Sequence, residues 1–342
     1  MKIQAIEERA GYSPEWDSFV ETAEGSAGFL SSRWTAAVMR LTAVPVHRLA
    51  AVGAGGRILA GLMFASRRRG PVAMARTPWA TPYCGPVFSG GLSAKDRLHA
   101  GEALASHLRS HYDYARLDTG IGFRDLLAFR EGWGLAVRNT YRLERGAGPV
   151  SECMSPSARR HLKKLSLNNL TIAASTDPAP LFEMYRDLYA RQGRPVSFNQ
   201  EDFAIFCATL LGAGRASLLY VRDDQPFAGM LVFRWRDTHF YSISAFRQER
   251  AALAGPTLLI WHYLENCVAP GESFDFVGAN VETPGINAFK RGFNPRECPY
   301  ISLERRSWPY QLCEPLIRLL HTTRSVAARV GGLHRSDPAV QL

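Results

Sequence analysis

Residues 128–145, AFREGWGLAVRNTYRLER, and residues 288–305, AFKRGFNPRECPYISLER, are two copies of one pattern. In both copies Ala-Phe, a basic residue, Gly and an aromatic residue occur in that order, followed by Tyr and then by Leu-Glu-Arg. The offset is 160 residues at both ends, from 128 to 288 and from 144 to 304. This agreement predicts an internal duplication, which would govern the architecture of the whole chain.

The two halves also agree in the order of their predicted elements. Upstream of the long repeat, AGLMF at 60–64 parallels AGMLVF at 228–233 in a hairpin-like stretch. In each half a helix-patterned segment follows, then a short strand that ends near an Asp, a helix that carries the Ala-Phe motif, and a last strand. Alternation of this kind predicts an α/β fold (α+β mixed sheets) with helices on both faces of each sheet.

The Gly-Ala-Gly-Pro stretch at 146–149 is a plausible linker between the halves. We therefore expect a first lobe at 1–148, a second lobe at 149–307, and a C-terminal amphipathic helix and tail at 308–342. A chain of 342 residues is long enough for two such domains.

Composition narrows the class of protein. No stretch approaches the roughly 18 consecutive apolar residues of a membrane span, and the N-terminus does not resemble a signal peptide. The six cysteines are scattered, without ligand spacing, which predicts reduced thiols in a cytoplasmic protein and no metal site. The net charge of +10 favours acidic partners, whether phosphates, nucleic acid or a membrane surface.

The order of the motifs resembles the Fem family, the two-lobed transferases of the GNAT acyltransferase superfamily that add amino acids to peptidoglycan precursors. The resemblance spans about residues 10–305. It is carried by WDSFV with GFLSSRW near the start, by SARRHLKK, by YRDLYARQG, and by FDFVGAN leading to FKRGF, at 16–20, 28–34, 157–164, 185–193, 274–280 and 289–293. It implies two tandem GNAT-like lobes, acyl or aminoacyl transfer to an amine, and no tightly bound cofactor.

Lys290 is the first candidate catalytic residue. The Fem-like motif implies that it binds the donor's carbonyl oxygen or a donor phosphate, and the first half has a basic residue, Arg130, at the same place. The alternative is an exposed cation on a helix. Phe289 beside it is a second candidate, with a core role as its alternative. Asp275 is a candidate general base, although an Asp in this position more often caps a loop or pairs with Arg.

Two basic segments are candidate binding sites. Arg159, Arg160, Lys163 and Lys164 lie at i, i+4 spacing on one predicted helix, so a bound anion and a solvated face are equal alternatives. Arg247, Arg250 and Gly255 occupy the place where single-lobe GNAT enzymes hold the pyrophosphate of coenzyme A, but the paired glycines of that loop are missing. Tyr83 and Asn280 complete the candidate substrate contacts. Cys84 is a conceivable nucleophile with no His placed to activate it.

The predicted function is N-acyl or aminoacyl transfer, from charged tRNA or another activated donor, onto an amine of a cell-envelope precursor or related small molecule. One alternative is an acyl-coenzyme A-dependent N-acyltransferase, and another is a non-catalytic module that binds an acidic ligand. A basic C-terminal helix at 310–329 would allow peripheral contact with a membrane that carries a lipid-linked acceptor. Nothing in the sequence indicates sequence-specific DNA binding.

Overall fold

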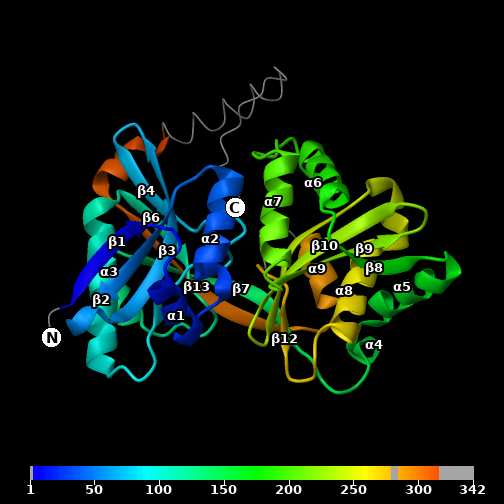
Figure 1. The fold of residues 1–342 in the computed structure, drawn as a ribbon, viewed down its shortest axis with the longest axis horizontal. Coiled ribbons are helices and arrows are strands. Elements are labelled where there is room, and N and C mark those ends of the chain that lie inside the picture. Colours follow the sequence, from blue (N-terminus) through cyan, green and yellow to red (C-terminus); the bar gives the residue numbers. More distant parts are fainter. Residues whose placement is uncertain (1–2, 279–283, 316–342) are drawn as a thin grey trace. The chain divides into compact units, whose positions relative to one another are not determined.

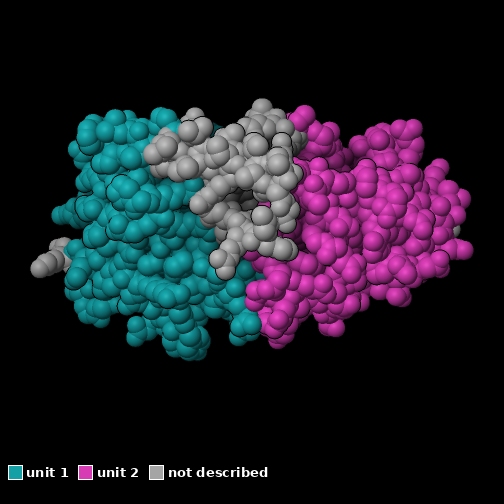
Figure 2. Space-filling view, turned by 90° about the horizontal axis from the view of Figure 1, so that it is seen from above, with its two compact units in different colours: residues 1–138, 299–335, 339–342 teal, residues 139–298, 336–338 magenta. Residues whose placement is uncertain are grey.

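The computed structural model describes residues 3–278 and 284–315 (Figure 1). The chain forms two compact units. Within the described residues, unit 1 comprises 3–138 with 299–315, and unit 2 comprises 139–278 with 284–298 (Figure 2). The predicted α/β class with mixed sheets is confirmed.

Unit 1 is a mixed sheet with strand order β1-β2-β3-β4-β6-β13, in which only the β4–β6 pair is parallel among the pairs described. Its strands are β1 (Gln4–Arg9), β2 (Val46–Val52), β3 (Ile58–Arg69), β4 (Val72–Arg76), β5 (Val87–Phe88), β6 (Tyr114–Asp118) and most of β13 (Arg296–Arg306). Its α-helices are α1 (Pro14–Thr22), α2 (Ser32–Thr42) and α3 (Ala94–His111), and α3 packs on the sheet over a core that includes Phe64, Leu104 and Phe129.

Unit 2 repeats this plan with strand order β7-β12-β11-β10-β9-β8. Its strands are most of β7 (Gly134–Glu144), β8 (Thr171–Ser175), β9 (Ala216–Arg222), β10 (Pro226–Trp235), β11 (Thr238–Phe246) and β12 (Ser273–Asp275). Its helices are α4 (Val150–Cys153), α5 (Pro156–Leu167), α6 (Ala179–Arg191), α7 (Gln200–Leu211), α8 (Gly255–Asn266) and α9 (Pro284–Arg291).

Helices cover both faces of the unit 2 sheet. The backbone of Gly229 in β10 is close to Leu181 of α6, whereas its neighbour Ala228 contacts Gly255 of α8. Successive residues of a strand point to opposite faces, so α6 and α8 lie on opposite sides of β10. This explains why β10 is buried along nearly its whole length instead of alternating.

The last strand of each half pairs within the other unit. β7, which ends the first half of the sequence, pairs with β12 of unit 2, and Leu143 lies opposite Phe274. β13, which ends the second half, pairs with β6 of unit 1, and Leu303 lies opposite Leu117. The compact units therefore differ from the linear division at 148/149 expected from the sequence, because each repeat contributes its final strand to the other unit.

A helix begins at Trp308, at the start of the predicted C-terminal segment, and packs Tyr310 against Tyr114 with ring centroids 4.6 Å apart. The rest of that segment, from 316 on, lies outside the described residues. Of the helices in the described ranges, none combines the length and the apolar run that crossing a membrane would require.

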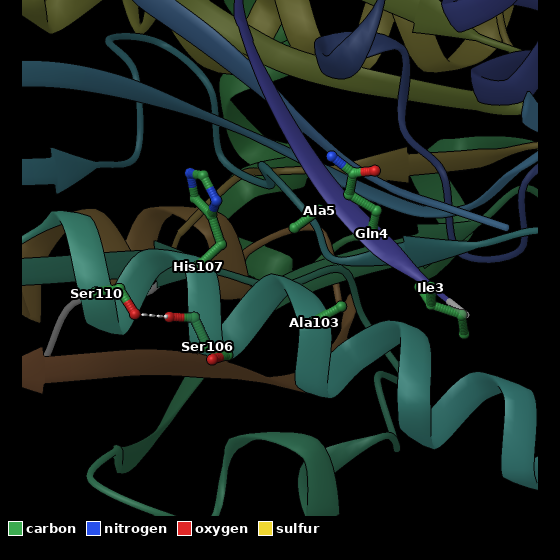
Figure 3. Close-up of a pocket in the computed structure, with 7 residues that line it drawn as sticks. All are labelled: Ile3, Gln4, Ala5, Ala103, Ser106, His107 and Ser110. Atoms are coloured by element: carbon green, nitrogen blue, oxygen red, sulfur yellow. Dashed lines mark hydrogen bonds between the residues drawn. The ribbon is translucent and has the colours of Figure 1, made fainter. Parts of the chain in front are cut away.

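A shallow pocket in unit 1 lies between β1 and α3. It is lined by Ile3, Gln4, Ala5, Ala103, Ser106, His107 and Ser110 (Figure 3). None of the candidate site residues from the sequence lines this pocket, so the candidate active site lies elsewhere in the chain.

Candidate active site in unit 2

The centre of unit 2 is a pair of parallel strands that separate. β11 and β12 pair over only three residues, from Thr238 opposite Ser273 to Phe240 opposite Asp275. Beyond this point β11 carries a bulge, since Leu231 faces Ile243 and Val232 faces Tyr241, which leaves Ser242 as the extra residue. Bulges bend strands and re-aim side chains beside active sites. The carboxyl ends of separating parallel strands are where α/β sheets bind ligands.

Lys290 lies at this open end. It is 5% exposed, on α9, and its ammonium donates to the carbonyl oxygen of Val277 at 2.7 Å and to that of Gly278. Burial lowers its pKa to about 8, although the nearby Asp275 charge favours the protonated form. At pH 7 the group is still mainly a cation, with a third N–H beyond its two recorded hydrogen bonds. The exposed-cation alternative does not describe this side chain.

Asp275 is fully buried at the end of β12. Its Oδ1 accepts a hydrogen bond from the Thr140 hydroxyl at 2.6 Å and from the backbone N–H of Val277 at 2.8 Å. The carboxylate therefore fixes the backbone conformation of the residues that follow β12. Whether it also takes part in chemistry stays a prediction.

Val277, which follows, has φ +51°. A positive φ is a genuine outlier for a β-branched residue and costs roughly 1–3 kcal/mol, and such strain is often found at functional sites.

Phe289 is half-buried against the core of unit 2. Its ring meets Phe293 edge-on at 5.9 Å, and Phe293 in turn lies 5.6 Å from Phe276. These contacts anchor α9 to the sheet beneath Lys290 and match the core role named for Phe289 in the sequence analysis.

The basic helix α5 is joined to two segments of unit 2, the end of α9 and the loop before α8. The backbone N–H of Ser155, just before α5, donates to Gly292 O at 2.8 Å, next to α9, and Lys164 near its other end donates to the carbonyl of Ala252. Arg159, Arg160 and Lys163 are exposed. The helix thus presents three cations while its fourth joins it to the loop before α8.

The loop before α8 forms a short 3₁₀ turn, Gln248–Leu253. Arg247 lies 3.5 Å from Glu183 and Arg250 lies 3.2 Å from Asp223. A Cβ added to Gly255 would lie 2.5 Å from the Cβ of Ala228, so close packing of α8 on β10 accounts for this glycine. Both candidate arginines therefore already have acidic partners.

In unit 1 the corresponding opening between β4 and β6 is filled by the chain itself. Cys84 connects β3 to the end of β6, because Met63 N–H donates to its carbonyl at 2.8 Å and its own N–H donates to Asp118 O at 2.9 Å. The Cys84 side chain is fully buried, and burial raises the pKa of its thiol to about 12, which makes it a poor nucleophile. Tyr83 is also buried, edge-on to Tyr300 at 5.5 Å. Asn280 lies outside the described residues.

Two groups of residues escaped the sequence analysis. His161 on α5 is half-buried with a buried Nδ1 that has no recorded partner in the described structure, and burial, followed by Lys164 and Arg160, lowers its pKa. At the closed end of the strand pair, buried His239 lies 2.9 Å from the Tyr263 hydroxyl and 3.0 Å from Glu272. His161 lies within the SARRHLKK segment and could have been found there, whereas His239 and Glu272 are 33 residues apart and give no sequence signal.

Comparison with known proteins supports this description. The family model for the acetyltransferase (GNAT) domain matches residues 156–291, which include α5, the separating strands and Lys290. The chain is an acyltransferase with a GNAT domain. Among curated proteins, no sequence match was found.

Solved structures extend the similarity to nearly the whole length of this chain. FemX has a TM-score of 0.64 at 13% identity, covering 88% of this chain and 97% of its own. The C-terminal domain of a putative lysylphosphatidylglycerol synthetase from Agrobacterium fabrum has a TM-score of 0.55 at 14% identity, covering 90% and 95%. L-PGS from Bacillus licheniformis has a TM-score of 0.53 at 11% identity, covering 88% and 95%. The resemblance to Fem-like GNAT transferases is thus confirmed at the level of the fold.

Proposed function

We propose that this protein is a Fem-like N-acyl or aminoacyl transferase whose donor binds at the open end of β11 and β12. The observation that carries the proposal is Lys290, a buried ammonium held by two carbonyls where the strands separate. A cation fixed in a low-dielectric site stabilises negative charge that develops on a carbonyl oxygen.

The reaction is direct transfer. The nitrogen of the acceptor amine attacks the carbonyl carbon of the donor ester or thioester. The oxyanion of the tetrahedral intermediate then accepts a hydrogen bond from the third N–H of Lys290. Collapse forms the amide bond and breaks the bond to the leaving oxygen or sulfur. The nitrogen loses one proton and the leaving group gains one. Alignment of the two reactants supplies the remaining acceleration. The inaccessible thiol of Cys84 supports a route without a covalent enzyme intermediate.

Charged tRNA is the donor that the surface favours. The exposed cations Arg159, Arg160 and Lys163 flank the site on α5, and phosphates of a nucleic-acid backbone bind such rows of basic residues. The arginines of the loop before α8 are already paired with acids, and its glycine is needed for packing, which leaves less to hold the pyrophosphate of coenzyme A.

The acceptor is an amine on a cell-envelope precursor or a related small molecule, and the protein acts in the cytoplasm. The name of the lysylphosphatidylglycerol synthetase, whose domain shares the fold, fits a lipid-linked acceptor and peripheral membrane contact. The exposed Trp308 and Leu312 on the helix that begins at 308 favour the same contact.

Acyl-coenzyme A is the alternative donor, favoured by the match of residues 156–291 to the acetyltransferase domain and by the helix N-terminus at Gly255. The two donors are separated by thermal unfolding of the purified protein with acetyl-coenzyme A, free coenzyme A or a charged-tRNA fraction. A ligand present at 100 times its Kd stabilises by about 2.7 kcal/mol, enough to be seen.

Stabilisation by charged tRNA is expected, and its salt dependence should weaken in the triple variant Arg159→Gln, Arg160→Gln, Lys163→Gln. Each lost phosphate contact lowers the slope of log K against log salt by about 0.7–0.9. Stabilisation by acetyl-coenzyme A alone would move the assignment to the alternative donor. Binding without product from any donor would instead leave a non-catalytic module for acidic ligands.

A further inference from the structure

The turn after β12 is held in an unfavourable backbone conformation. Val277 and Gly278 both have positive φ, +51° and +65°. Glycine adopts this region freely, but a β-branched residue does so only when its surroundings enforce it.

Asp275 and Lys290 enforce it from two sides. Asp275 accepts the N–H of Val277 at 2.8 Å, and Lys290 donates to the carbonyls of Val277 and Gly278. Asp275 is itself fixed by Thr140 on β7, whose hydroxyl donates to the carboxylate at 2.6 Å. The side chains of Asp275 and Thr140 are completely buried. The turn is therefore rigid, and its two carbonyls bind the ammonium of Lys290. Asp275, Val277 and Gly278 are called the lysine seat, or the seat, below.

Unit 1 supplies an internal comparison. Asp118 ends β6 as Asp275 ends β12, but Gly120 and Ile121, the second and third residues after it, do not have positive φ. The position that matches Lys290 is Arg130, which is exposed. Of these two turns, the one with positive φ is thus in unit 2, where the matching basic residue is the buried Lys290.

We propose that Asp275 is a positioning residue, which acts through the left-handed turn at Val277 to aim the third N–H of Lys290 at the donor carbonyl. In this role Asp275 accepts hydrogen bonds from Thr140 and from the Val277 N–H instead of accepting the proton of the acceptor amine. This inference rests on the proposed function, since it assumes that transfer takes place at Lys290.

The test compares Asp275→Asn with Asp275→Ala, with Asp187→Asn on the exposed face of α6 as the control. Asparagine keeps an oxygen that can accept the Val277 N–H, so we expect kcat at pH 6.5 within about threefold of wild type. Alanine loses the acceptor, and kcat should fall roughly 100-fold with little change in KM, as for a group that acts in the transition state.

The pH profile provides a readout that a purely structural role would not change. Asp275 raises the pKa of Lys290, so in Asp275→Asn the alkaline limb of the profile should move below pH 8. In the double variant Asp275→Ala, Val277→Gly, part of the lost kcat should return, because glycine adopts positive φ without help.

Asp275→Asn as inactive as Asp275→Ala would identify a general base and overturn the inference. A second measurement does not depend on activity. The chain has five lysines, Lys2, Lys95, Lys163, Lys164 and Lys290, so selectively labelled lysine gives a simple NMR spectrum. In Asp275→Ala the Lys290 signal should move, and an unchanged signal would contradict the seat. Full activity of Lys290→Met would instead refute the proposed function.

Discussion

At the scale of single residues, the sequence identified Lys290 but not its environment. The Phe-Lys-Arg-Gly-Phe motif and the repeat both pointed to it. Its partners, Val277 and Gly278, lie 13 and 12 residues away, and the positive φ of Val277 has no signature in a sequence where valine normally indicates extended structure. The burial that lowers its pKa depends on tertiary packing, which a local pattern does not encode.

The depressed pKa of Lys290 predicts a pH-dependent stability. The ordinary pKa is 10.5 and the folded value is about 8, so between these pH values the unfolded chain binds more protons and stability rises with pH. Relative to Lys290→Met, wild type should gain about 3 kcal/mol of unfolding free energy from pH 8 to 10.5. Urea denaturation across that range measures it. The exposed Lys95→Met is the control, and equal curves for both variants would refute the buried cation.

At the scale of elements, alternating strands and helices were predictable because they depend on local periodicity. The close approach of α8 to β10 was not predictable from the sequence. Because of it, Gly255 is explained by packing instead of by contact with a phosphate. The bulge at Ser242 was also missed, because it depends on the register between β10 and β11.

Gly255→Ala tests the packing interpretation. The new Cβ would lie 2.5 Å from Ala228 and 3.0 Å from Phe227, so we expect a loss of about 1–3 kcal/mol in unfolding free energy. Gly146→Ala, which has nothing within 4 Å, is the matched control and should be nearly neutral. A stable Gly255→Ala protein that has lost only donor binding would restore the phosphate-contact role.

Three elements of unit 1 are joined by Glu7 on β1. Its carboxylate accepts from the Tyr112 hydroxyl at 2.6 Å and lies 2.8 Å from His47 on β2 and 2.7 Å from His107 on α3. Burial opposes ionisation, but hydrogen bonds from His107, His47 and Tyr112 hold the pKa of Glu7 well below its usual range.

A lowered carboxylate pKa gives stability that is present above pH 4.5 and is lost as the pH falls further. Glu7→Gln should therefore cost roughly 2 kcal/mol at pH 7, with the deficit shrinking between pH 5 and 3. Its exposed neighbour Glu8, paired with Arg48, should cost under about 1 kcal/mol when changed to Gln. Chemical denaturation at several pH values compares the two, and a pH-independent deficit for Glu7→Gln would contradict the network.

At the scale of the whole molecule, the duplication was predictable but the exchange of final strands was not. Both Leu-Glu-Arg strands have the same local pattern, and nothing in that pattern says which sheet each joins. Only the register shows that Leu143 lies opposite Phe274 and Leu303 opposite Leu117.

The exchange predicts the behaviour of fragments. Residues 1–148 lack β13, which pairs with β6, and residues 149–342 lack β7, which pairs with β12. Each fragment alone should show poor dispersion in NMR spectra, whereas co-expressed fragments should associate and recover the spectrum of the intact chain. Two fragments that fold separately and do not associate would show that the repeats close their own sheets.

The most direct test of the central claim, that the open end of β11 and β12 carries acyl transfer with the help of Lys290, is product formation. Mass spectrometry would follow amide formation from charged tRNA or acetyl-coenzyme A with a panel of amines, for wild type, Lys290→Met and Lys95→Met. Loss of one preorganised donor to an oxyanion typically costs 10²–10³-fold in kcat. We therefore predict that Lys95→Met retains transfer and that Lys290→Met loses at least about 100-fold. Equal rates in all three proteins would contradict the account.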